Sequence, residues 1–276
     1  MTFNYFSKNG EVLPLKDAVV PLSSIEYSYG YGVYETLRVS NGVVHFLSDH
    51  LDRLLESARI INLEHIFEAS KIEKYLIELI KENKVETCNV KILLIGGSKK
   101  EEAQLFIICL NPLFPDKRLY RDGANLVTSQ YERIYPHAKT MNMLQSYLAY
   151  RKAREVGAYD SLIINRAGFV TEGTRTNFFC IRGKTIYTPS EKDILLGVTR
   201  KMVLKVALDN GYRVEEANIG VGDIAEYDGA FISSTSSKII PIKTVDDKVL
   251  KPIPEELKRL MSLFDEFLSE YEASEV

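Results

Sequence analysis

The stretch that decides the fold runs from Tyr135 to Phe179 and reads YPHAKTMNMLQSYLAYRKAREVG, AYDSLIIN and RAGFVTEGTRTNFF. It places Lys139 after a proline turn, at the start of a helix, and then strands that lead to Glu172. A lysine after a turn and a glutamate after a strand are usually solvated surface charges when each is taken singly. A functional interpretation therefore has to rest on the order of these and other candidate residues along the whole chain.

The sequence around these two residues predicts alternating helices and strands. The helix after Lys139 should end near Gly157 and bury one stripe, formed by Leu144, Tyr147, Leu148 and Ala153. SLIIN, FVTEG and TNFFCIRGKTIYTP predict a meander, and ILLGVTRKMVLKVALDNG predicts a helix entered and left through glycine. GAFISSTS and IIPIKTV predict further strands, and an amphipathic helix begins at Pro254.

The first part of the chain also reads as strands and helices. Asn41-Gly42 between VYETLRV and VVHF predicts a hairpin, because this pair accepts positive φ at both turn positions. Amphipathic helices are expected from Ser48 and from Ser70, the second with Glu73 as its capping-box partner. CNVKILLIGG and AQLFIICL then predict two strands joined by the charged turn SKKEE.

A break in regular structure divides the chain. NPLFPDKRLYRDG carries two prolines between apolar strands, which favours a domain boundary there. At 276 residues the chain suits one large α/β unit or two packed lobes. We expect an N-terminal α/β lobe over residues 1–113, an interdomain loop over 114–122 and a C-terminal lobe over 123–276.

Composition indicates an ordinary soluble protein with small-molecule partners. Hydrophobic residues make up 45%, charged residues 26%, and the net charge of −3 gives no electrostatic reason to expect nucleic acid. The N-terminus lacks the order of a signal peptide, and no apolar run approaches the ~20 residues that span a bilayer. Three scattered cysteines favour a reduced cytoplasmic setting, and four histidines without paired spacing give no reason to expect a metal.

Five groups of residues together suit a phosphorylated pyridine aldehyde. They are an arginine on a helix, the lysine, the glutamate, a glycine-led helix start and a hydroxyl-rich strand end: Arg53, Lys139, Glu172, Gly197-Val198-Thr199 and Ser233-Ser234-Thr235. A helix N-terminus offers free N–H groups and a favourable dipole to an anion such as phosphate. An arginine offers several planar donors to phosphate oxygens.

At this point the sequence resembles the class IV aminotransferases, a pyridoxal-phosphate group that includes branched-chain aminotransferases, D-amino acid aminotransferases and aminodeoxychorismate lyases. The resemblance covers nearly the whole chain. It rests on GYGVYETLRV with HFLSDHLDRLLESA, AKTMN, GFVTEGTRTNFF, TPSEKDILLGVTR and FISSTSSKIIPI. It implies an α/β (α+β) fold of two lobes, with a smaller N-terminal α/β lobe and a larger C-terminal β-barrel-like lobe with helices. It also implies a homodimer.

The resemblance implies roles for the lysine and the glutamate. Lys139 would form a Schiff base with pyridoxal 5'-phosphate and, once displaced by substrate, move a proton between the substrate Cα and the cofactor. Only a neutral primary amine can condense with an aldehyde and be released again. Glu172 would pair with the pyridine nitrogen and keep it protonated, so that the ring accepts electrons.

The resemblance also implies the remaining binding residues. Arg53, Thr199, Ser234 and Thr235 would hold the phosphate, together with the N–H groups of Gly197 and Val198. Leu195 would pack on the cofactor ring. Tyr34 would line the substrate pocket, and Ser236 would offer an N–H group to a substrate carboxylate. For each of these residues the alternative is an ordinary structural role, such as a helix cap, a core leucine or a half-buried strand tyrosine.

The sequence departs from every subgroup, so the substrate stays open. Met141-Asn142-Met143-Leu144 replaces the Gly-Asn-Tyr run of branched-chain enzymes, and GGSKKEEAQ lacks the Arg-x-His pair of D-amino acid enzymes. Lys91 and Thr36 match positions of aminodeoxychorismate lyases, whose arginine-glycine-tyrosine loop is missing. We therefore expect a transaminase acting on an amino acid or amine and a 2-oxo acid. A lyase that releases pyruvate and 4-aminobenzoate, or a non-enzymatic cofactor-binding protein, are the alternatives.

Overall fold

The computed structural model describes residues 3–112 and 114–275, which form two compact units. The first unit contains the described residues up to 112 together with 137–142 and residue 275. The second contains residues 114–136 and 143–274. The chain therefore returns to the first unit for six residues, and Lys139 lies in that return.

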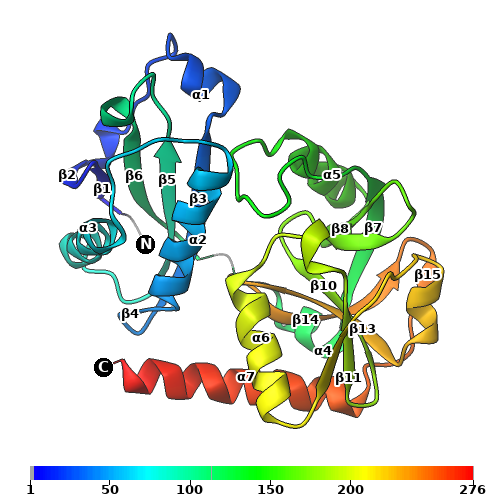
Figure 1. The fold of residues 1–276 in the computed structure, drawn as a ribbon. Helices are drawn as coiled ribbons and strands as arrows, with labels where there is room; N and C mark the ends of the chain where they lie inside the picture. Colours follow the sequence, from blue (N-terminus) through cyan, green and yellow to red (C-terminus); the bar gives the residue numbers. More distant parts are fainter. Residues whose placement is uncertain (1–2, 113, 276) are drawn as a thin grey trace. The chain divides into compact units, whose positions relative to one another are not determined.

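The first unit is a six-stranded antiparallel sheet with the order β2-β1-β6-β5-β3-β4 (Figure 1). The strands are β1 (Tyr5–Lys8), β2 (Glu11–Pro14), β3 (Gly32–Ser40), β4 (Val43–Val44), β5 (Cys88–Ile95) and β6 (Gln104–Leu110). Helices α2 (Leu47–Ile60) and α3 (Ala69–Glu82) cover one face of this sheet. Their apolar stripes and the alternate strand residues facing them form one buried core, as their periodicity predicts.

Local sequence signals in this unit predict the hairpin correctly and one helix start incorrectly. Asn41 and Gly42 both have positive φ, 52° and 79°, and join β3 to β4. The expected capping box at Ser70 is wrong, because α3 begins at Ala69 with Glu68 as its N-cap and no side-chain cap hydrogen bond. Ser70 lies inside the first turn, where its hydroxyl cannot take the capping position.

The second unit contains a nine-stranded sheet, part of which closes into a barrel. β9 (Val170–Gly173) pairs with both β8 (Asp160–Ile164) and β10 (Asn177–Arg182), the latter through Glu172 opposite Asn177. The ring continues through β13 (Gly229–Ser234), β14 (Lys238–Val245) and β7 (Ala124–Gln130). β11 (Thr185–Thr188) and β12 (Arg213–Glu216) extend the sheet beyond β10, and β15 (Lys248–Val249) pairs with β14. The β-barrel-like character expected for the C-terminal lobe is confirmed.

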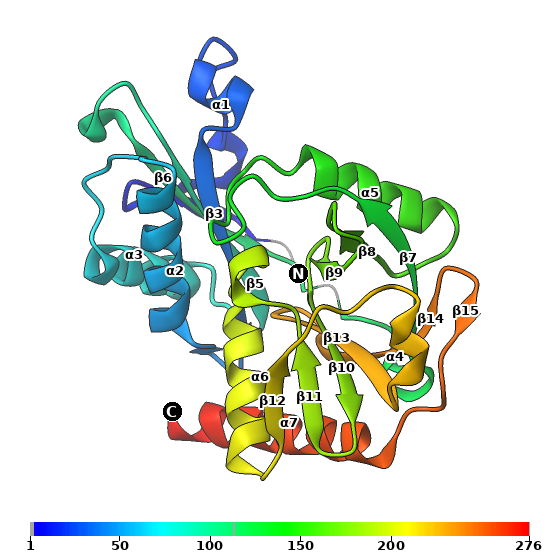
Figure 2. The ribbon, with the colours of Figure 1, turned by 45° about the vertical axis from the view of Figure 1, so that its right-hand side comes forward.

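The helices of the second unit, within its described residues, are α4 (Lys117–Asp122), α5 (Leu144–Glu155), α6 (Val198–Asp209) and α7 (Glu255–Ser274). α5 lies along β7 and β8, while α6 packs on α7, β12 and β13 (Figure 2). α4 occupies most of the segment 114–122, for which the sequence predicts a loop. The side chain of Asp116 caps it by accepting a hydrogen bond from the N–H of Arg118.

The shorter elements are α1 (Ile25–Tyr29) and single 3-10 turns at Leu15–Asp17, Lys100–Glu102, Glu191–Asp193 and Asp223–Glu226. Among the helices within residues 3–112 and 114–275, none is long and apolar enough to cross a membrane.

The buried face of α5 differs from the predicted one. The side chains that face inward are Ser146, Ala149 and Ala153, whereas Leu144, Tyr147 and Leu148 are exposed by 62%, 59% and 48%. Of the predicted stripe only Ala153 is buried. Small side chains let this helix approach β7 and β8 closely, so the large apolar groups are left on its outer face.

Candidate active site

The backbone around Lys139 is fixed in the first unit by β3 and α2. The N–H of Tyr34 donates to the carbonyl of Lys139 at 2.9 Å, and the N–H of Met141 donates to the carbonyl of Gly32 at 2.9 Å. The N–H of Lys139 donates to Oγ of Ser57, a buried serine of α2, at 3.0 Å. Lys139 therefore lies in a segment that pairs with β3, five residues before α5, and the expectation of a helix start at this lysine is wrong.

The side chain of Lys139 lies over the ring of Tyr34. Its Nζ is 4.6 Å from the ring centroid, and Nζ of Lys91 is 5.4 Å from the same centroid. In the described residues neither ammonium group has a carboxylate within ion-pair distance. Thr36 stands directly opposite Lys91 in the β3–β5 register. The structure thus brings together four predicted site residues of the first unit: Tyr34, Thr36, Lys91 and Lys139.

Arg53 of α2 belongs to a buried cluster beneath the same strand. Its Nε and Nη2 donate to the two carboxylate oxygens of Glu35, at 2.6 and 2.8 Å, and Nδ1 of His50 lies 2.8 Å from Oε2 of Glu35. Burial opposes the charged form of Glu35, but the charges and hydrogen bonds of Arg53 and His50 outweigh it and hold the pKa of Glu35 well below its usual range. Glu35 thus fixes the orientation of Arg53. The side chain of Arg53 is 12% exposed.

In the second unit Glu172 is 2% exposed and lies at the closure of the barrel. Nε of Arg133 donates a short hydrogen bond to its Oε1, and the N–H of Leu195 donates to its Oε2 at 3.3 Å. A buried carboxylate beside an arginine stays ionised, because the opposite charge compensates for the lost water. The structure therefore places a buried carboxylate next to the positive charge of Arg133.

The start of α6 and the turn after β13 bring the predicted phosphate-binding residues of this unit together. Oγ1 of Thr199 lies 3.4 Å from Oγ1 of Thr235. The first N–H groups of α6, beginning at Val198, follow the N-cap Gly197 and have no preceding helical turn to bond to. A Cβ at Gly197 would lie 2.1 Å from Oδ1 of Asn177, so only glycine fits at this position. Hydroxyls and free amides on one helix start suit an anion.

Neighbouring side chains hold this arrangement in place. Oγ of Ser234 lies 2.6 Å from Oγ of Ser237 and 3.4 Å from Oγ of Ser236. Nδ2 of Asn177 donates to the carbonyl of Leu195 at 2.8 Å. Leu195 is buried. Its backbone is held by hydrogen bonds to Asn177 and Glu172.

Sequence reasoning missed residues that act on the predicted ones, among them Glu35, which orients Arg53, and Arg133, Ser57 and Asn177. Arg133 lies six residues before Lys139 in a polar loop, and Ser57 is one of several polar positions on an amphipathic helix. No local sequence pattern indicates a functional role for Arg133 or Ser57. Asn177 could have been suspected, because a polar amide stands there between buried strand residues in TNFFC.

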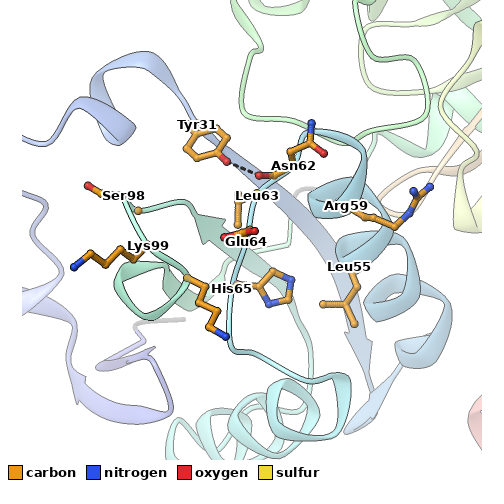
Figure 3. Close-up of a pocket in the computed structure, with 11 residues that line it drawn as sticks. Tyr31, Leu55, Arg59, Asn62, Leu63, Glu64, His65, Ser98 and Lys99 are labelled. Carbon is orange, nitrogen blue, oxygen red and sulfur yellow. Dashed lines mark hydrogen bonds between the residues drawn. The ribbon is translucent and has the colours of Figure 1, made fainter.

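A separate hollow of about 590 Å³ lies in the first unit (Figure 3). It opens between the segment after α2 and the loop after β5, and its lining includes Asn62, His65 and Lys99. The hydroxyl of Tyr31 donates to the carbonyl of Asn62 at 2.8 Å and closes one side. Its lining residues include none of the site residues predicted from the sequence, so the hollow does not belong to the candidate active site.

Comparison with known proteins identifies the family of this arrangement. The family model for amino-transferase class IV matches residues 32–245. D-alanine aminotransferase of Bacillus licheniformis is 28% identical over 251 residues, which make up 88% of this chain and 88% of that protein.

Solved structures agree with this match. The branched-chain aminotransferase of Thermoproteus uzoniensis, solved with norvaline, has a TM-score of 0.86 at 27% identity, covering 96% of this chain and 94% of that chain. The branched-chain amino acid aminotransferase of Escherichia coli has a TM-score of 0.90 at 22% identity, with coverage of 96% and 94%. The second likeness shows a shared fold.

Proposed function

Because this chain belongs to the class IV aminotransferase family, we propose that it moves an amino group between an amino acid or amine and a 2-oxo acid, with pyridoxal 5'-phosphate held at Lys139. The observation that carries the proposal is the Lys139 side chain. Its Nζ lies over Tyr34 without a carboxylate partner in the described residues, and its backbone is tied to β3 and Ser57. A placed amine without a counter-ion suits covalent capture of an aldehyde.

The residues present suit the cofactor. When bound, it supplies an aldehyde that takes up the amino group and a pyridine ring that withdraws electrons from the substrate carbon. Lys139 would hold the aldehyde carbon and, once released, carry a proton on Nζ to and from the substrate Cα. Glu172 would accept a hydrogen bond from the pyridine nitrogen, and Arg133, which donates to the same carboxylate, favours its charged form.

Residues of the second unit suit the phosphate group. The hydroxyls of Thr199 and Thr235 and the first N–H groups of α6 match the needs of its oxygens. Ser234 would support this turn through its bond to Ser237. Arg53, oriented by Glu35, is proposed as the cationic group on the phosphate, on the strength of the family resemblance.

The test is a spectrum of the purified protein with added cofactor. We expect an absorbance band near the edge of the visible range that is lost in Lys139→Ala. It should persist in the matched control Lys8→Ala, since Lys8 also lies over an aromatic ring of the same sheet, that of Phe106. Amino donors should convert the band, and a 2-oxo acid should restore it. A protein that never develops the band would refute the proposal.

A second candidate activity is the aminodeoxychorismate lyase reaction. Thr36 faces Lys91 across the β3–β5 register, beside the ring over which Lys139 lies, so the two lyase-like residues share one side of the sheet. A lyase releases pyruvate from aminodeoxychorismate catalytically without any 2-oxo acid acceptor. Offering this substrate alone separates the two activities, and absence of pyruvate would rule the lyase out.

A homodimer and a reducing cytoplasmic setting complete the proposal. Support for a second copy comes from large exposed apolar side chains on and around α5: Ile134, Leu144, Tyr147, Leu148 and Val156. An exposed apolar patch of this kind is typical of interaction surfaces. Cys88, Cys109 and Cys180 are buried free thiols, which suits a reducing compartment. Light scattering after gel filtration measures the oligomeric state directly.

A further inference from the structure

The turn between β13 and β14, residues 235–237, presents several groups that suit an anion. The hydroxyl of Thr235 lies 3.4 Å from the hydroxyl of Thr199 at the start of α6. Within the described residues the N–H groups of Thr235 and Ser236 donate to no protein acceptor, and both residues are half-buried. Hydrogen bonds weaken steeply when their geometry is poor. Whether these donors meet a phosphate oxygen therefore depends on the conformation of the turn.

That conformation requires an unusual backbone angle at Lys238, the first residue of β14. Its φ is 54°, in the left-handed region that residues with a Cβ rarely adopt, and hairpins of this length normally place glycine there. Nζ of Lys238 lies 2.6 Å from a carboxylate oxygen of Asp265 on α7. This ion pair is 33% and 60% exposed, so it contributes little to holding the backbone. Another contact has to keep Lys238 in this conformation.

Tyr120 supplies such a contact from α4. Its hydroxyl donates to the carbonyl of Ser237 at 3.1 Å. The ring packs on the core of the second unit, and α4 lies along β14 (Figure 2). The carbonyl of Ser237 and the nitrogen of Lys238 belong to one planar peptide unit. Holding that carbonyl therefore restricts rotation about φ of Lys238, which is the rotation that would release the strained angle.

We propose that Tyr120 is a positioning residue for the cofactor phosphate. Its hydroxyl holds the β13–β14 turn so that the hydroxyl of Thr235 and the N–H groups of Thr235 and Ser236 are directed at the phosphate oxygens. The inference rests on the proposed function, because it takes a phosphorylated cofactor as the ligand. Tyr120 acts through Ser237 and is not a catalytic residue.

The alternative is that the hydroxyl of Tyr120 serves only the stability of the second unit. Tyr212 provides a matched control for this role. Its hydroxyl donates to the carbonyl of Glu256 on α7 at 2.8 Å, and neither of these residues belongs to the proposed site. Tyr120→Phe and Tyr212→Phe each remove one hydroxyl from a tyrosine-to-carbonyl bond and keep the ring. Both variants should therefore melt at a lower temperature than wild type.

Ligand affinity separates the two roles. Binding of pyridoxal 5'-phosphate and of pyridoxal is measured by fluorescence titration, and binding of inorganic phosphate to the cofactor-free protein by calorimetry. Because the left-handed lysine already disfavours the turn, losing the Tyr120 bond should lower the fraction of protein in the binding conformation. Tyr120→Phe should bind pyridoxal 5'-phosphate and phosphate about 3- to 10-fold more weakly, with pyridoxal affinity unchanged. Tyr212→Phe should bind all three ligands as wild type does.

Substitutions at Lys238 test the mechanism from the other side of the peptide. Glycine adopts positive φ without strain, so Lys238→Gly added to Tyr120→Phe should restore the phosphate affinity. A β-branched residue is strongly disfavoured at this angle. Lys238→Val should therefore reproduce the selective loss of phosphate affinity although Tyr120 is intact.

Two results would overturn the assignment of Tyr120. One is an unchanged affinity of Tyr120→Phe for both phosphorylated ligands, or a loss that extends equally to pyridoxal. The other is a loss that Lys238→Gly does not reverse. In either case wild type can still bind the cofactor and transfer amino groups, so the proposed function stands. A wild type that never develops the cofactor band refutes the proposed function, and the role of Tyr120 with it.

Discussion

Replacing Arg133 by an apolar residue should leave the buried carboxylate of Glu172, where the barrel closes, without the positive charge of this arginine. The two side chains are exposed by only 14% and 3%, and the arginine donates directly to the carboxylate. In Arg133→Met the carboxylate keeps its place in β9 but loses its counter-charge, while the methionine fills much of the vacated volume. The perturbation is therefore electrostatic more than steric.

The size of the effect follows from the burial of the pair. Removing one partner of a buried ion pair costs about 3–5 kcal/mol, and the partial exposure of Arg133 favours the lower end. At about 3 kcal/mol the melting temperature should fall by roughly 6–12 °C for a unit of this size. Replacing both residues by methionine should recover most of this loss, because two apolar groups leave no charge stranded.

Thermal and urea unfolding of the four proteins, wild type, both single variants and the double variant, measure the coupling between the residues. The matched control is Arg166→Met, whose arginine pairs with Glu132 while 92% exposed and should change the stability by less than about 0.5 kcal/mol. Additive single effects would refute the reasoning.

Three further outcomes are expected. Glu35→Gln should be about 3 kcal/mol less stable than wild type at neutral pH. Because Arg53 and His50 hold the pKa of Glu35 below its usual 4.5, its contribution is present above that value and is lost as the pH falls, so acid unfolding curves of the two proteins should converge. Thr199→Val should weaken binding of the phosphorylated cofactor about tenfold in a fluorescence titration, while binding of pyridoxal, which lacks the phosphate, should not change. Leu148→Glu should shift the protein from dimer to monomer in light scattering, and an unchanged mass would argue against a dimer contact at this residue.

The elements and their order can be predicted from the sequence because strand and helix periods are local. The Asn41-Gly42 hairpin and the glycine-bounded α6 follow from such local rules. The buried face of α5 does not, since large apolar side chains at helical spacing normally face inward. Here Ala149 and Ala153 face β7 and β8 instead. Which face of α5 is buried depends on how closely β7 and β8 approach the helix. That distance cannot be predicted from the local sequence pattern.

The candidate site shows the same division between local and long-range information. Lys139, Glu172 and Thr199 each stand in a recognisable run of letters, so their identity can be proposed from sequence. Ser57 and Arg133 act from 82 and 39 positions away from the residues they hold. Their contribution exists only once the chain has folded back, as residues 137–142 do when they pair with β3.

The distribution of paired and unpaired charge links the fold to the proposed chemistry. Two buried carboxylates are paired with an arginine, Glu35 with Arg53 and Glu172 with Arg133. The two lysines over Tyr34 have no such partner among the residues described. Lys139 and Lys91 therefore place two amine groups beside the ring of Tyr34 with no carboxylate at ion-pair distance in the described residues.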